Sequence, residues 1–120
     1  MIGTLLRRAW RRLRLARRRP RPGETGTLDF GDASASWLAG VEADFDALVD
    51  AENLAGTGKP GAGGALSKLA SSGRATRYPA GARVRVLEVR GLRCQVEMRD
   101  EPDRGRRGWV QLRFVKRDGA

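Results

Sequence analysis

The chain has 120 residues, which is enough for one small domain with appended segments but too few for two domains of ordinary size. It contains one cysteine and no histidine, which excludes an internal disulfide and a cysteine-based zinc site and removes the usual general base and metal ligand. An enzyme is therefore the least expected class, and we predict no catalytic residue, no metal site and no cofactor.

The net charge of +10 is divided into three blocks of alternating sign. Residues 1–23 carry nine arginines and no acid, residues 24–54 carry eight acids and no basic residue, and residues 55–120 carry fifteen basic and six acidic side chains. Because blocks of opposite charge attract each other, the acidic block can neutralise basic side chains of the same chain or of another copy. The overall charge therefore does not by itself predict a nucleic-acid partner.

Residues 1–22 form a basic arm rich in arginine. The apolar residues of positions 1–19 recur at helical spacing, which predicts an amphipathic helix that ends at the prolines of positions 20 and 22. The residues on its apolar face are Ile2, Leu6, Ala9, Leu13 and Ala16, with Trp10 at the border. Since no apolar run exceeds two residues, the arm is expected to be neither a transmembrane helix nor a secretory signal.

Three interpretations of the arm remain open. It is a solvated tail, because clustered like charges oppose helix formation; or it lies on an anionic membrane, with Trp10, Leu6 and Leu13 at the interface; or it follows the phosphates of a nucleic acid. The apolar face favours a membrane or a protein over nucleic acid. The candidate contacts to an anionic surface or to phosphates are Arg7, Arg8, Arg11, Arg12, Arg14, Arg17, Arg18 and Arg19.

Residues 23–33 continue a stretch rich in Gly, Pro and Thr and are predicted to be a linker. Residues 34–54 are predicted to be an acidic amphipathic helix, because Trp37, Val41, Phe45 and Leu48 recur at helical spacing. Its other faces carry Glu42, Asp44, Asp46, Asp50 and Glu52. This acidic surface is either a solvated face or a docking surface for the arginine arm or for arginines on the β-barrel predicted below for residues 76–117.

Residues 55–64 contain a G-x-G-x-x-G pattern at Gly56, Gly58 and Gly61. We reject a nucleotide site here, because that fingerprint follows a strand and opens a helix, whereas this segment follows a predicted helix and contains Pro60. The segment is expected to be a flexible linker. Residues 65–73 are predicted to form a short helix.

Residues 76–117 are predicted to form a small β-barrel. Residues 83–89 read as a first strand whose apolar pattern shifts between Val86 and Leu87, which indicates a bulge. Residues 92–98 alternate strictly, with Leu92, Cys94, Val96 and Met98 facing one side. Residues 109–112 follow as a third strand, and a tight turn leads to a last short strand. The fold class is therefore mainly β with a helical N-terminal part.

This segment resembles an SH3-like barrel, and it is most similar to the bacterial SH3-type domains. The resemblance rests on Tyr78-Pro79-Ala80-Gly81, Val84-Arg85-Val86-Leu87, Gly108-Trp109-Val110 and Phe114-Val115, within about 40 of the 120 residues. It implies that Trp109 faces a ligand groove while Val110 enters the core. Eukaryotic SH3 domains differ in their Ala-Leu-Tyr-Asp-Tyr opening and in a proline two residues after the tryptophan, where this chain has Gln111.

The groove that this resemblance implies has Trp109, Tyr78 and Phe114 as its candidate residues. The alternative for Trp109 is a structural tryptophan packed against the helix of Trp37 and Phe45. We expect a non-catalytic SH3-like binding or accessory module that recognises a protein or a cell-wall peptide and is localised by the polybasic arm. The alternatives are a small basic protein that binds nucleic acid and a peripheral membrane protein, with a cytoplasmic or membrane-associated location favoured.

Overall fold

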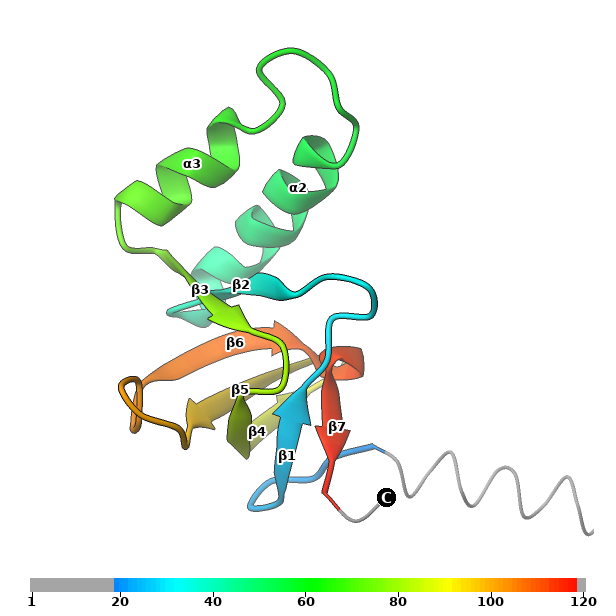
Figure 1. The fold of residues 1–120 in the computed structure, drawn as a ribbon, viewed down its shortest axis with the longest axis vertical. Coiled ribbons are helices and arrows are strands. Elements are labelled where there is room, and N and C mark those ends of the chain that lie inside the picture. The colour runs from blue at the N-terminus through cyan, green and yellow to red at the C-terminus, as the bar shows by residue number, and fades with distance from the viewer. Residues whose placement is uncertain (1–18, 119–120) are drawn as a thin grey trace, which may run out of the picture.

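The computed structural model describes residues 19–118 (Figure 1). Within this range seven antiparallel strands form one sheet in the order β3-β2-β6-β5-β4-β1-β7, which does not close on itself. The strands are β1 (Thr25–Leu28), β2 (Ala35–Ala39), β3 (Ala75–Pro79), β4 (Arg83–Arg90), β5 (Arg93–Met98), β6 (Arg107–Gln111) and β7 (Val115–Arg117). The helical elements are η1 (Glu42–Asp44), α2 (Phe45–Ala55), α3 (Gly64–Ser71) and η2 (Leu112–Phe114). The mainly β class is confirmed.

The C-terminal strands follow the sequence pattern closely. β4 and β5 pair through a tight turn at Gly91, where φ is +59°, and the register of this pair shifts between Val86 and Glu88. The bulge predicted at this point is confirmed. It bends β4, so that its first half pairs with β1 as well as with β5.

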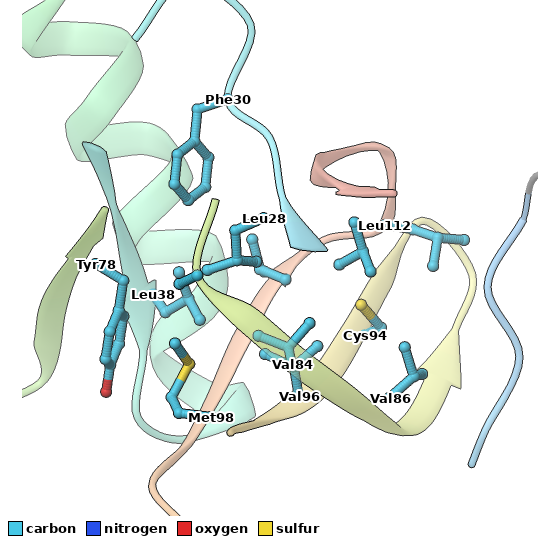
Figure 2. Packing of buried hydrophobic residues seen from close by; sticks show 13 residues of the cluster. Leu28, Phe30, Leu38, Tyr78, Val84, Val86, Cys94, Val96, Met98 and Leu112 are labelled. Carbon is cyan, nitrogen blue, oxygen red and sulfur yellow. The ribbon is translucent and has the colours of Figure 1, made fainter. Parts of the chain in front are cut away.

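A first hydrophobic core lies inside the bend of the sheet (Figure 2). The predicted interior residues Val84, Val86, Cys94 and Val96 are fully buried, and Val110 is nearly so. Tyr78 on β3 and Val115 on β7 belong to the same core although these strands stand at the two ends of the sheet order. The sheet therefore curls around this core without closing into a barrel.

The prediction of a linker over residues 23–33 is wrong in part, because β1 lies within it. β1 pairs with β4 on one side and with β7 on the other, and Leu28 is buried in the first core. Gly26 permits this arrangement, since a Cβ atom at this position would collide with the backbone carbonyl of Lys116 in β7. The glycine at position 26, which is typical of a linker, is here required by the close approach of β1 and β7.

The prediction of one helix over residues 34–54 is wrong in its first half. Residues Ala35–Ala39 form β2, which pairs along its whole length with β3, and Ala39 also pairs with Trp109 on β6. Helix α2 starts only at Phe45, after a bend at Gly40 whose N–H donates to the carbonyl of Arg74. The apolar residues recur at helical spacing here, but Gly40 lowers the helix propensity of this stretch, and pairing with β3 makes residues 35–39 a strand.

Helices α2 and α3 form a hairpin that stands on the strands β2 and β3 (Figure 1). The short helix α3 lies close to the range predicted for it, and the glycine-rich residues 55–64 connect it to α2. A second hydrophobic core fills the space between the hairpin and the sheet. Its buried members are Ala39, Phe45, Leu48, Ala51, Leu69, Ala75 and Trp109, with Trp37, Val49 and Leu66 partly buried at its margin.

Candidate functional site

Trp109 does not form a ligand groove. Its side chain is only 5% exposed, and it packs in the second core with Phe45 and Leu48 of α2. The neighbouring Val110 points to the opposite side of β6, into the first core. The alternation implied by the SH3 resemblance is therefore present, but the hairpin covers the face of β6 on which a ligand was expected, and Trp109 is the packed structural tryptophan of the alternative interpretation.

Tyr78 and Phe114 do not join Trp109 at a common surface. Tyr78 is buried in the first core, where burial and then the nearby Asp103 carboxylate raise the pKa of its phenol. Phe114 lies half-buried in η2, with its ring edge-on to Phe30 at a centroid distance of 5.5 Å. The predicted three-residue groove is thus wrong, because two of its residues are buried in different cores.

The predicted arm contacts lie almost entirely outside the described residues. This holds for Leu6, Trp10 and Leu13, and for every candidate arginine up to Arg18. Arg19 is described and is exposed at the point where the chain enters the folded body. The composition of the arm still counts for the charge balance, since residues 1–18 hold seven arginines and no acid.

The acidic block of residues 24–54 is largely paired with basic residues of the C-terminal segment. Glu42 in η1 and Asp46 in α2 pair with arginines of β4 and β5, and Asp44 in η1 pairs with Arg74, which precedes β3. The two acids that flank β1 pair with basic residues of β7. The pairs are Glu42–Arg90 (2.6 Å), Asp44–Arg74 (2.5 Å), Asp46–Arg93 (2.9 Å), Asp29–Lys116 (2.5 Å) and Glu24–Arg117 (2.5 Å). The docking interpretation of the acidic face is therefore confirmed for the C-terminal arginines.

Two of these arginines also contact aromatic rings of the second core. The Arg93 guanidinium lies 4.5 Å from the centroid of the Phe45 ring, and the Arg90 guanidinium lies 5.7 Å from that of Trp109. Each cation thus contacts a carboxylate and an aromatic ring at once, so that Arg90 joins β4 to η1 and Trp109, and Arg93 joins β5 to α2.

A half-open groove lies where the arm joins the body. It has a volume of about 580 Å³ and is lined by Arg19, Pro20, Leu92, Leu112, Arg113, Val115, Lys116 and Arg117. Four of these residues are basic and four are apolar. Such a lining suits a ligand that combines negative charge with apolar groups.

Leu92 is the residue that the sequence pattern misplaces. The alternation of residues 92–98 predicts that it faces the core, but it lies in the turn before β5 and is 79% exposed. The signal that could have found it is the turn dipeptide Arg90-Gly91, which puts Leu92 at the apex of the hairpin rather than inside the strand. Nothing in the sequence indicated that Leu112 and Val115 would line a groove with it.

The buried thiol of Cys94 is expected to be unreactive at neutral pH. It is fully buried in the first core, and this burial raises its pKa to about 12. A thiol with so high a pKa is neither a nucleophile nor a metal ligand at neutral pH. Across residues 19–118, histidine, cysteine and carboxylate side chains nowhere gather in a group of three that could hold a metal ion.

Within residues 19–118 there is no helix of the length and apolarity needed to cross a membrane. Neither a protein-family model, a curated protein nor a solved structure matches the chain. The interpretation of the site therefore rests on its residues.

The carboxyl group of Glu52 can be used to test the contact between α2 and β2. It is half-buried against β2 and accepts a hydrogen bond from Ser36 Oγ at 3.3 Å, and burial raises its pKa. Because the folded state then binds the proton more tightly than the unfolded state, the stabilisation is complete below the unfolded pKa and is lost as the pH rises through the folded pKa. We expect Glu52→Gln to raise the free energy of unfolding at pH 7 by roughly 0.5 kcal/mol, because it removes a charge whose burial is unfavourable. The effect is small because water still screens this half-exposed group, and little effect is expected near pH 4.

Urea denaturation at both pH values measures this difference in the free energy of unfolding. Asp44→Asn is the control, because its effect on stability at pH 7 is expected to be the opposite. The Arg74 guanidinium lowers the pKa of Asp44, so the stability from this carboxylate is present at pH 7 and is lost as the pH falls through its folded pKa. Asp44→Asn is therefore expected to destabilise the protein at pH 7. A Glu52→Gln variant that is less stable than the wild type at pH 7 would contradict the expected effect of burial on Glu52.

Proposed function

We propose that the protein is a non-catalytic SH3-like accessory module that is held at an anionic membrane surface by its arginine-rich arm. A protein or peptide partner, as the sequence resemblance implies, would then meet the module at that surface. The SH3-like part of the proposal is supported by the strands β6-β5-β4-β1-β7, which are consecutive in the sheet, and by the first core, most of whose buried residues lie on these strands. The 3-10 turn η2 leads into the last short strand, in agreement with the tight turn predicted from the sequence at this point.

The observation that carries the membrane part is the separation of charge between the body and the arm. Residues 19–118 contain 17 basic and 14 acidic side chains, and five of the eight acids in the acidic block are paired within this body. Residues 1–18 contribute the remaining seven positive charges. Since the acids that were candidates to neutralise the arm are mostly occupied, its charge is left for an external anion.

The pattern of the arm favours a lipid surface over a nucleic acid as that anion. Each basic residue near an anionic bilayer contributes about 1 kcal/mol. Apolar residues at helical spacing, with a tryptophan at their border, can be buried at the level of the lipid headgroups. Binding to the phosphates of a nucleic acid makes no use of such apolar residues. The arm therefore carries both kinds of interaction that a peripheral membrane helix needs.

Co-sedimentation of the full chain with vesicles tests the proposal. We expect binding to vesicles of phosphatidylcholine with about 30% phosphatidylglycerol, weak binding to pure phosphatidylcholine, and a decrease as salt screens the charges. Deleting residues 1–18 or introducing Trp10→Asp should abolish binding, whereas Trp10→Phe should retain it. Circular dichroism of each variant checks that the body is folded.

A nucleic-acid function would give a different set of results. Binding to a DNA duplex that falls steeply with salt and is unchanged by Trp10→Asp, together with no binding to anionic vesicles, would overturn the membrane proposal.

A further inference from the structure

The turn between β4 and β5 presents an apolar side chain to solvent beside a basic surface. Leu92 stands at this turn and has the highest exposed fraction among the large hydrophobic residues of the described chain. Gly91, with φ +59°, forms the turn that holds it there. A single exposed leucine is ordinary on a protein surface, so Leu92 becomes informative only together with the basic groove beside it.

The groove next to Leu92 has positive charge that is not neutralised. Lys116 and Arg117 are paired with carboxylates, but among residues 19–118 no acidic side chain lies within ion-pair distance of Arg113 or Arg19. The Arg113 guanidinium instead lies 4.8 Å from the centroid of the Phe114 ring and donates to Gln111 Oε1 at 2.9 Å. The groove therefore combines two cations that no described carboxylate neutralises with one exposed apolar side chain, Leu92, since Pro20, Leu112 and Val115 are themselves buried.

The position of the groove ties it to the arm. Arg19 and Pro20, the first two described residues, line the same groove as Leu92. Whatever surface the arm binds is consequently within reach of this face of the body. The arm itself is a poor occupant of the groove, because both are positively charged.

We infer that Leu92 and the adjoining basic groove form a second membrane contact, in which Leu92 enters the boundary between headgroups and acyl chains while Arg19 and Arg113 meet lipid phosphates. This inference rests on the proposed membrane function and adds the orientation of the body on the bilayer. A bilayer fits better than a duplex, because an exposed leucine between cations is stabilised by entering lipid and gains little from a phosphate backbone. The hairpin of α2 and α3 then points away from the surface, since it stands at the far end of the molecule from the first described residues (Figure 1).

A fluorescent probe at position 92 tests the contact directly. Because the Cys94 thiol is buried and its pKa is raised to about 12, a maleimide dye reacts selectively with the thiol introduced by Leu92→Cys. We expect an environment-sensitive dye there to brighten and shift to the blue when the full chain binds vesicles containing phosphatidylglycerol. The matched control is Leu54→Cys, because Leu54 is 47% exposed at the end of α2 and should give no change.

Substitution by a charged residue gives the second measurement. Leu92→Asp should weaken vesicle binding about five- to tenfold through lost burial and added repulsion, whereas Leu54→Asp should leave it unchanged. Both side chains are exposed, so neither variant should disturb folding. Arg113→Gln should reduce the affinity for anionic vesicles by a smaller factor.

The outcomes separate this inference from the proposed function. If the full chain sediments with vesicles through its arm, but the dye at position 92 does not respond and Leu92→Asp binds normally, the inference fails and the function stands. If the wild-type chain does not bind anionic vesicles at low salt, both are overturned. A response of the dye to a DNA duplex but not to vesicles would also overturn the inference.

Discussion

Trp109→Ala is expected to lower the free energy of unfolding by about 3–5 kcal/mol, the usual cost of removing a large buried aromatic side chain. Trp109 lies at the centre of the second core and is the residue of β6 that the hairpin covers. Its removal leaves a cavity between α2 and the sheet and also removes the ring that Arg90 contacts. Urea denaturation followed by far-UV circular dichroism measures the loss.

Trp109→Phe is the control for this prediction. The smaller ring keeps an apolar, aromatic side chain under the hairpin, so it should recover a large part of the stability. Unfolding of Trp109→Ala at the same urea concentration as the wild type would contradict the burial of Trp109 under the hairpin, and a ligand groove at Trp109 would again be possible.

Gly26→Val is the second substitution with a large expected effect, a loss of about 3 kcal/mol. A Cβ atom at position 26 would meet the backbone carbonyl of Lys116, and that atom belongs to the strand that pairs with β1. A backbone group cannot rotate away as a side chain can, so β1 and β7 have to separate. Thermal unfolding is expected at a clearly lower temperature.

Gly64→Ala is the matched control for Gly26→Val. Gly64 is the first residue of α3, and a Cβ atom there would meet nothing within 4 Å. Because alanine favours a helix over glycine, the variant should be as stable as the wild type or more stable, by up to about 1 kcal/mol. Equal stability of Gly26→Val and Gly64→Ala would show that β1 and β7 do not approach each other closely.

The ion pairs between the acidic block and the C-terminal segment determine how charge is distributed in this chain. The pairs Glu42–Arg90 and Asp46–Arg93 join η1 and the start of α2 to the strands β4 and β5, and Asp44–Arg74 joins η1 to the loop before β3. Most of these side chains are partly exposed, so each pair contributes little stability by itself. Their main effect is on the distribution of charge, because they leave a nearly balanced body attached to a strongly positive arm.

Local patterns in the sequence determined those parts of the fold in which the conformation and burial of a residue follow from the residues next to it in the chain. The alternation of Cys94, Val96 and Met98 predicted β5 and its buried face, and the shift after Val86 predicted the bulge. In these places the strand period alone decides which side chains are buried. The absence of histidine and of a second cysteine likewise bounded the chemistry, because composition does not depend on how the chain folds.

The tertiary structure alone decided where β2 runs, what Trp109 faces and which residues line the groove. The spacing of Trp37 and Phe45 suits a helix, but pairing with β3, which follows only after the hairpin, makes residues 35–39 a strand. Trp109 lies on the side of β6 opposite the first core, and only the placement of the hairpin makes that side buried. Leu92 is exposed because the chain turns at Gly91. The strand β2 and the burial of Trp109 depend on contacts between segments distant in sequence, and such contacts leave no periodic signal in either segment.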